Sequence, residues 1–218
     1  AAIHVGQTPE SATGAIIPPI YATSTYAQLG PGETRGYDYT RSGNPNFTNL
    51  EQTLCALEGA EHATVFATGM SAITAVISTL STGDLVIAEE NIYGCTFRIY
   101  DEVFAKFGVK IEYCDLTDPA NFDRIRKRSP QLVWIESPTN PLLKILDIQT
   151  IADAAHNTGA ALVVDNTFAS PYFQKPLTLG ADISLSSTTK YINGHSDCLG
   201  GVVLCRDSAW HEKMVFAQ

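Results

Sequence analysis

The segment SLSSTTKYINGHSD, residues 184–197, joins a short apolar run to a cluster of hydroxyl side chains and a lysine, Lys190. The apolar residues 183–185 have the length and composition of a buried strand. Hydroxyls and backbone N–H groups at a strand end suit a phosphate, so Ser187 and Thr189 are candidate phosphate ligands. A lysine beside that phosphate could form an imine with an aldehyde-bearing cofactor. The ordinary alternatives are a solvated surface ammonium and a polar turn.

Short apolar runs of this kind recur along the chain and alternate with segments of helical spacing. Strands buried on both faces, with helices between them, predict an α/β fold with a mainly parallel sheet and flanking helices. No convincing helix precedes the final strand, which could therefore be antiparallel. The expected strands are 63–66, 85–88, 110–113, 132–135, 161–164, 183–185 and 202–205, and the expected helices are 47–57, 71–80, 96–107, 119–127, 148–158 and one beginning near Ser208.

The beginning of the chain has a different character. Residues 1–45 are rich in Gly, Pro, Thr and Tyr and show little periodicity, which is typical of an extended N-terminal arm. Residues 46–218 carry the alternating strand and helix signals. We therefore predict an arm over 1–45, followed by one α/β domain over 46–218.

Composition argues against a nucleic-acid-binding protein, a membrane protein and a protein held together by disulfides or zinc. The 218 residues are 44% hydrophobic, carry a formal charge of −9 and contain no basic run, so nucleic acid is not an expected partner. No apolar run approaches the ~20 residues of a membrane span. The five cysteines form no C-x-x-C pair, which argues against a disulfide framework or a zinc site and favours reduced thiols in the cytoplasm. His195, Asp197 and Cys198 lack a distant partner ligand and make a poor zinc pattern, so we expect no metal.

Two further segments carry candidate chemistry. Val163-Val-Asp165-Asn-Thr places a carboxylate at the C-terminal end of a buried strand, where it could hold a pyridine nitrogen protonated and make the ring an electron sink. Thr68-Gly69-Met70-Ser71 lies between a strand and a helix, where backbone N–H groups can approach an anion closely. A capping acid and a tight turn are the respective alternatives. The absence of G-x-x-x-x-G-K-[ST] and G-x-G-x-x-G weakens phosphate-loop and dinucleotide interpretations.

Together these segments resemble the Cys/Met-metabolism family of pyridoxal-phosphate enzymes. The resemblance implies a fold-type I large domain after an extended arm, pyridoxal 5′-phosphate as cofactor and a small sulfur amino acid as substrate. It also implies a homo-oligomer, a dimer of dimers, with active sites shared between subunits. The matching stretches run in order along the chain: PPIYATSTY (18–26), YDYTRSGNPN (37–46), ATGMSA (67–72), IYGCTFR (92–98), WIESPTNP (134–141), VVDNTFASPYFQKPL (163–177) and SSTTKYINGHSD (186–197).

The resemblance implies catalytic roles at three positions. Lys190 would hold the cofactor as an imine and then shuttle protons between substrate carbons. Asp165 would bind the pyridinium nitrogen. Tyr93 would stack on the ring and act as acid or base near the leaving group.

The remaining implied roles concern cofactor binding. The backbones of Gly69 and Met70 and the hydroxyls of Ser187 and Thr189 would hold the phosphate, and Asn140 would lie near the 3-oxygen of the ring. Tyr39 and Arg41 would contact the phosphate in a neighbouring subunit, a role that suits a bidentate guanidinium. A packed tyrosine and a surface arginine are the alternative for this pair.

Two departures from the family pattern affect the expected site. Ser186 stands where the family often has histidine. The family's C-terminal domain, which supplies the arginine for the substrate carboxylate, is absent from these 218 residues. We therefore expect a cofactor site with an incomplete substrate site.

The resemblance is strongest to cystathionine γ-lyases, with γ-synthases and methionine γ-lyases next. It implies γ-elimination on cystathionine to cysteine, 2-oxobutanoate and ammonia. Cys95, two places after Tyr93, instead fits methionine γ-lyases, although it could be a small buried thiol. A non-enzymatic alternative is a truncated assembly or binding fragment, against which the presence of Lys190, Asp165 and Tyr93 together argues.

Overall fold

In the computed structural model, which describes residues 2–218, seven strands form one sheet in the order β1-β7-β6-β5-β4-β2-β3. The neighbours from β3 to β6 pair parallel, whereas β7 pairs antiparallel with both β6 and β1. The mainly parallel sheet and the antiparallel final strand are both confirmed. The strands are β1 (His62–Phe66), β2 (Leu85–Glu89), β3 (Lys110–Cys114), β4 (Leu132–Glu136), β5 (Ala161–Asp165), β6 (Ile183–Ser186) and β7 (Gly201–Cys205).

The reversed strand β7 determines where the ends of the other strands lie. Since β1 is antiparallel to β7 and β7 is antiparallel to β6, β1 points the same way as the parallel strands. Every strand except β7 therefore ends at the same edge of the sheet. Ligands of open α/β sheets bind at this carboxyl edge.

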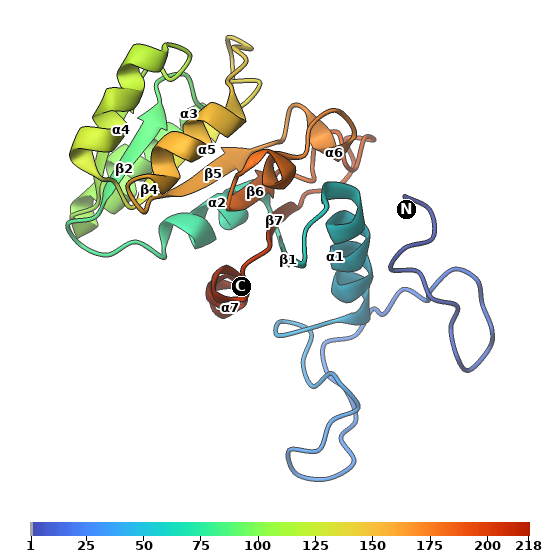
Figure 1. Cartoon of the computed structure of the whole chain (residues 1–218). Coiled ribbons are helices and arrows are strands. Elements are labelled where there is room, and N and C mark those ends of the chain that lie inside the picture. The colour runs from blue at the N-terminus through green and yellow to red at the C-terminus, as the bar shows by residue number, and fades with distance from the viewer. Residues whose placement is uncertain (1) are drawn as a thin grey trace.

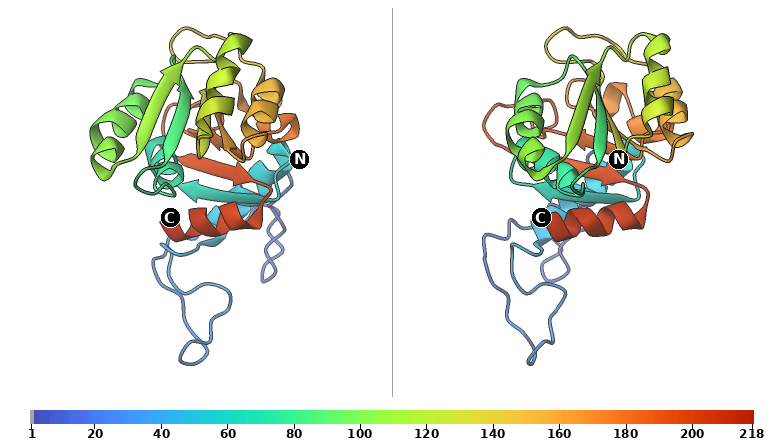
Figure 2. Two further views of the ribbon diagram at one scale, coloured as in Figure 1. Left: turned by 60° about the vertical axis from the view of Figure 1, so that its left-hand side comes forward. Right: turned by 90° about the vertical axis from the view of Figure 1, so that its left-hand side faces the viewer.

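Helices cover both faces of the sheet (Figures 1 and 2). On one face, a core cluster includes buried residues of α1 (Pro45–Glu58), α4 (Phe122–Arg128) and α5 (Ile148–His156). On the other, a second cluster includes buried residues of α2 (Gly69–Ile77) and α7 (Ser208–Ala217). Because both faces are buried, strands β2, β4 and β5 are almost continuously apolar up to their last residue.

The helix expected over 96–107 is not one regular α-helix. It divides into α3 (Gly94–Arg98), a π-helical turn over Ile99–Val103 and a 3₁₀ turn over Phe104–Phe107. The wider turn accommodates Tyr100, which is buried edge-on against Trp134 with ring centroids 5.9 Å apart. The helix expected over 119–127 likewise begins with a 3₁₀ turn, Pro119–Asn121, and the remaining short elements are α6 (Ser170–Phe173) and a 3₁₀ turn over Pro176–Leu179.

Residues 2–44 project from the sheet and its helices (Figures 1 and 2). Among residues 2–44 the regular pairing consists of two isolated bridges, Thr25 with Tyr39 and Gly30 with Glu33. Asn44 accepts a hydrogen bond from the Asn46 N–H at 2.8 Å and caps α1. The arm is irregular where the sequence predicts it, and its status as a separate unit stays a prediction.

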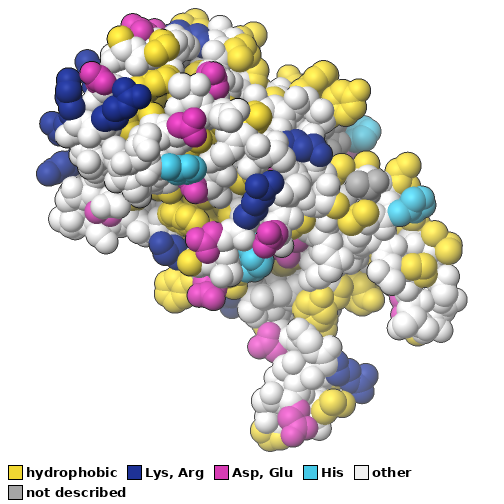
Figure 3. Space-filling view, viewed as in Figure 1, with side chains coloured by type: hydrophobic (Ala, Val, Ile, Leu, Met, Phe, Trp, Pro, Cys, Tyr) yellow, Lys and Arg dark blue, Asp and Glu magenta, His cyan; other side chains and the backbone are white. Residues whose placement is uncertain are grey.

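Charged side chains are unevenly spread over the surface. Figure 3 shows Lys and Arg gathered at the α4 side of the molecule, where Arg126 pairs with Asp123 and Arg128 with Glu112. Ion pairs on an exposed helix face are ordinary solvated features. No helix within residues 2–218 is both long enough and apolar enough to cross a membrane.

Candidate cofactor site

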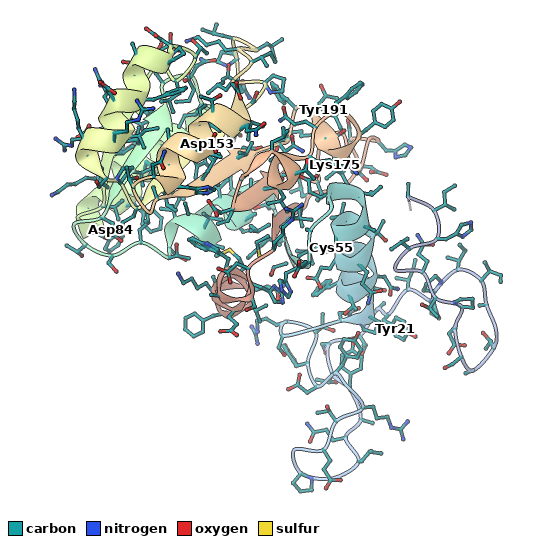
Figure 4. All side chains as sticks on the ribbon, in the orientation of Figure 1. Tyr21, Cys55, Asp84, Asp153, Lys175 and Tyr191 are labelled. Carbon is teal, nitrogen blue, oxygen red and sulfur yellow. The ribbon has the colours of Figure 1, made fainter. Side chains whose placement is uncertain are left out.

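A cavity of about 210 Å³ lies at the carboxyl edge of the sheet. It is larger than the ~150 Å³ cavity that accommodates a benzene ring, so one substituted aromatic ring fits. In Figure 4, Tyr191, the neighbour of Lys190, lies beside α6 at this edge, whereas Asp84, which precedes β2, lies on the opposite side. Eight of the ten predicted site residues line the cavity: Gly69, Met70, Tyr93, Asn140, Asp165, Ser187, Thr189 and Lys190.

The turn from β1 to α2 approaches the loop after β6 very closely. A Cβ built on Gly69 would lie 2.7 Å from the Cβ of Ser187, so only glycine permits this approach. The Thr68 hydroxyl accepts from the Ser71 N–H at 3.0 Å and caps the helix. Within residues 2–218, the N–H groups of Gly69 and Met70 have no hydrogen-bond acceptor. Free donors at the positive end of a helix, beside a hydroxyl, are what a phosphate requires.

Thr189 and Ser187, the two predicted phosphate ligands after β6, are held by different partners. The Thr189 hydroxyl donates to the Gly200 carbonyl at 3.2 Å and accepts from the Gly200 N–H at 3.1 Å. The Ser187 N–H donates to the hydroxyl of Thr167 at 2.9 Å. Thr167 also lines the cavity and was missed by the sequence reasoning, although its place two residues after Asp165 is a signal.

Asp165 ends β5 and is buried at the floor of the site. Its carboxylate accepts from the Thr167 N–H at 2.9 Å. Burial raises its pKa, an effect partly opposed by the hydrogen bonds with Thr167. None of the ion pairs formed within residues 2–218 includes Asp165. A protonated pyridine nitrogen would supply the missing counter-ion.

Glu136 is a second buried carboxyl in the cavity, and the sequence reasoning missed it. It ends β4 and pairs in register with Asp165 on the neighbouring strand β5. Burial first and the nearby Asp165 second raise the pKa of Glu136 to about 8, against the lowering effect of the Tyr93 and Asn140 amides. Its position at the end of an apolar strand, like that of Asp165, could have identified it.

Tyr93 and Lys190 form the open side of the cavity. Tyr93 is 39% exposed, and its pKa is raised by a hydrogen bond with the Cys95 thiol first and by burial second. Lys190 is exposed and also lines an adjoining hollow of about 680 Å³ with residues of the following loop. The amine therefore lies between the cavity and solvent, where a substrate could reach it.

Tyr39 and Arg41 lie elsewhere in this single chain. They line a separate hollow of about 1710 Å³ between the arm, α2 and α7. The Arg41 guanidinium carbon lies 5.0 Å from the centre of the Tyr39 ring. Their expected contact with the phosphate of a neighbouring subunit stays a prediction.

His195, Asp197 and Cys198, which make a poor zinc pattern in the sequence, are all exposed on the loop after Lys190, and the absence of a metal there stays a prediction. The one cluster of three possible metal ligands within residues 2–218 is Glu89, Glu90 and Asp115. The ammonium of Lys144 lies 3.3 to 3.6 Å from all three carboxylates and offsets part of their charge.

Comparison with known proteins agrees with this geometry. The family model described as Cys/Met metabolism PLP-dependent enzyme matches residues 1–218. A probable cystathionine gamma-synthase of Herpetosiphon aurantiacus is 49% identical over 100% of the chain, which covers 68% of that protein. A cystathionine gamma-lyase of Dictyostelium discoideum is 46% identical over 99% of the chain and 56% of its own length.

Solved structures show the same similarity. The crystal structure of metB from Corynebacterium glutamicum superposes with a TM-score of 0.96 at 46% identity, over 99% of this chain and 56% of that one. The chain thus spans between about half and two thirds of the length of these relatives.

Proposed function

Because the chain belongs to the Cys/Met metabolism family of pyridoxal-phosphate-dependent enzymes, we propose that it provides the cofactor site of a carbon–sulfur lyase. The reaction that we propose is γ-elimination on cystathionine, which yields cysteine, 2-oxobutanoate and ammonia. The observation that carries the proposal is the meeting of Lys190, Asp165 and the free N–H groups of α2 around one cavity. An amine, an acid and an anion site in this arrangement match the aldehyde, ring nitrogen and phosphate of a single ligand.

The positions of Lys190, Asp165 and Tyr93 in the cavity suggest a chemical role for each. Bound pyridoxal phosphate supplies an electron sink for a carbanion at the substrate α-carbon. Lys190 supplies the amine that holds the cofactor aldehyde, and from the cavity mouth it can take and return substrate protons. Asp165 keeps the ring nitrogen protonated because a buried carboxylate without a cation favours a charged partner. Tyr93 orients the ring, and its phenol, with a raised pKa, retains its proton and can donate it to a leaving thiolate.

The first experiment addresses the cofactor. The purified protein, supplied with pyridoxal phosphate, should show a visible absorption band that borohydride removes, with the mass increment on the peptide containing Lys190. The Lys190→Ala variant should lack the band, and Lys175→Ala, a matched lysine outside the cavity, should retain it. A band that persists in Lys190→Ala would contradict the proposal.

A second candidate reaction has support from one comparison. The relative from Herpetosiphon is described as a probable cystathionine gamma-synthase, so the same site could form cystathionine in place of cleaving it. Steady-state assays of the protein with cystathionine, with methionine, and with cysteine plus an activated homoserine would separate the lyase, methionine γ-lyase and synthase activities. Release of 2-oxobutanoate from cystathionine as the fastest reaction is the expected result.

The proposal includes assembly and location. We propose a homo-oligomer in which the arm of one subunit completes the site of another, because Tyr39 and Arg41 lie apart from the cavity of their own chain. The five cysteines are all unpaired in residues 2–218, which suits the reducing cytoplasm that we propose as its location.

A further inference from the structure

The ends of β2 and β4 carry two buried glutamates in contrasting surroundings. Glu89 at the end of β2 accepts from the Leu116 N–H at 2.7 Å and lies 3.6 Å from the Lys144 ammonium. Glu136 at the end of β4 is equally enclosed but forms no ion pair within residues 2–218. Only Glu136 lines the cofactor cavity. The first glutamate is therefore compensated by a cation, whereas the second faces the ligand without one.

The nearest charged neighbour of Glu136 makes its ionisation costly. Register places Asp165 directly beside it on β5, and both carboxyls are buried. Two adjacent buried carboxylates without a cation cannot both be charged at low cost. The other titratable groups facing Glu136 are Tyr93 before α3 and Lys190 across the cavity. Since Asp165 has the ring nitrogen as its natural counter-ion, Glu136 is the member of the pair that stays protonated.

Glu136 also fixes the residue that covers the ring. Its Oε1 accepts a hydrogen bond from the Tyr93 N–H at 2.8 Å. Tyr93 is the N-cap residue directly before α3, and its side chain caps no helix amide. The Glu136 carboxyl oxygen is therefore a side-chain contact that holds the Tyr93 backbone at this helix start. A displaced or shortened acceptor would release the backbone that carries the stacking phenol.

We propose that Glu136 is a positioning residue that works in its uncharged form, anchoring the Tyr93 backbone and leaving Asp165 as the single negative charge at the ring nitrogen. The inference rests on the proposed function, because it concerns the same site. An uncharged acceptor can be replaced by an amide oxygen. Glutamine should therefore substitute for Glu136, whereas a shorter acid or a missing side chain should not.

The test compares Glu136→Gln, Glu136→Asp and Glu136→Ala as purified proteins, without any assay of turnover. Affinity for pyridoxal phosphate is measured by titration, and the orientation of the bound ring is measured by visible circular dichroism. Glu136→Gln should bind within about threefold of wild type and keep the dichroic band. Glu136→Ala and Glu136→Asp should bind roughly tenfold more weakly, with a reduced band, because the Tyr93 amide loses its acceptor.

A matched control removes the charge of the other glutamate. Glu89→Gln should lower the unfolding temperature, since Lys144 loses a partner, yet leave the affinity and the dichroic band unchanged. An equal loss of the band in Glu89→Gln would show that the readout reports general destabilisation, and the proposal would fail.

The remaining outcomes are also decisive. Impairment of Glu136→Gln to the level of Glu136→Ala would mean that the charge is needed, and wild-type behaviour of all three variants would mean that Glu136 positions nothing. If Glu136→Ala does not fold, comparing the cofactor affinity and dichroic band of Glu136→Gln with those of Glu136→Asp tests the proposal in the same way. Wild-type protein that fails to bind pyridoxal phosphate at Lys190 would overturn the proposed function itself, which separates the two failures.

Discussion

Gly69 is a position in the cofactor cavity where an added side chain would collide with a neighbouring segment. Its Cα faces Ser187, and an added Cβ would lie 2.7 Å from the serine Cβ and 3.2 Å from its Cα. The Ser187 N–H donates a hydrogen bond to the Thr167 hydroxyl at 2.9 Å, which fixes the backbone of Ser187. Neither side of this contact can withdraw without moving a residue that we propose as a phosphate ligand.

Gly69→Ala should therefore lower the affinity for pyridoxal phosphate by roughly tenfold or more, since overpacking at a fixed contact costs ~1–3 kcal/mol. Equilibrium titration of the visible band measures the change. Gly94→Ala is the matched control, because a Cβ there meets no atom within 4 Å. Equal affinities of the two variants would show that the Gly69 contact is not rigid.

Local motifs explain which cavity residues could be predicted from the sequence and which could not. Lys190, Asp165 and Gly69 could be predicted because each stands beside an apolar strand in a distinctive local motif. Glu136 was missed because its significance depends on the register that pairs it with Asp165 and on the Tyr93 amide. Neither relation is local in the chain.

The N-terminus of helix α2 carries the proposed anion site. Thr68 and Ser71 form a reciprocal capping box, in which the Thr68 N–H donates to the Ser71 hydroxyl at 2.9 Å. Helix α5 has a comparable cap, Asp147, which accepts from the Thr150 N–H at 3.1 Å. The residues that line the cofactor cavity include Thr68 but not Asp147.

Thr68→Ala and Asp147→Ala should each lower the free energy of unfolding by about 1 kcal/mol through the lost cap. Only Thr68→Ala should also weaken binding of pyridoxal phosphate, because the free N–H groups of Gly69 and Met70 lose their fixed direction. Urea unfolding and cofactor titration of both variants measure the two effects separately. Weakened cofactor binding in both would indicate a general loss of stability.

The helical segment after Tyr93 differs from the single helix that the spacing of apolar residues predicts. Spacing over 96–107 predicted one helix, whereas the chain forms α3, a π turn and a 3₁₀ turn. Packing of Tyr100 against Trp134 outweighs the regular helical hydrogen bonding there. Such a contact between distant segments leaves no mark on local periodicity.

The whole molecule buries several carboxyls, which couples its stability to pH. Glu58 at the end of α1 accepts from the Ser184 hydroxyl of β6 at 2.5 Å. Burial raises its pKa from 4.5 to about 7, against smaller lowering effects of Ser184 and Lys175. The folded chain therefore holds this proton more tightly than the unfolded chain, and stability falls as pH rises from about 4.5 to 7.

Glu58→Gln should remove this loss, because the amide oxygen still accepts from Ser184 and never ionises. Its free energy of unfolding should exceed that of wild type at pH 8 by on the order of 3 kcal/mol and approach the wild-type value near pH 5. Urea unfolding of the cofactor-free protein from pH 5 to 8 provides the measurement. Glu61→Gln, an exposed control, should give a curve parallel to wild type, and a parallel curve for Glu58→Gln would contradict the argument.

Assembly is the other property of the whole molecule. If the arm of one subunit completes the site of another, Arg41→Ala and Lys190→Ala impair different subunits of a shared site. Subunits of the two inactive variants, mixed under conditions that allow exchange, should regain about a quarter of wild-type sites by random pairing in a twofold dimer. Absence of any recovery, with exchange verified by tagged subunits, would place Arg41 outside the shared site.

The α/β class, the approximate positions of the strands and the motifs with the lysine, the acid and the proposed anion-binding turn can all be predicted from the amino-acid sequence. These features are local, because period, apolar runs and turn residues lie within a few positions of one another. In contrast, the meeting of the ends of β1, β4, β5 and β6 at one edge and the place of Glu136 in the cavity follow from the folded chain. Strand order, register and burial depend on contacts between residues far apart in the chain, and no single segment encodes them.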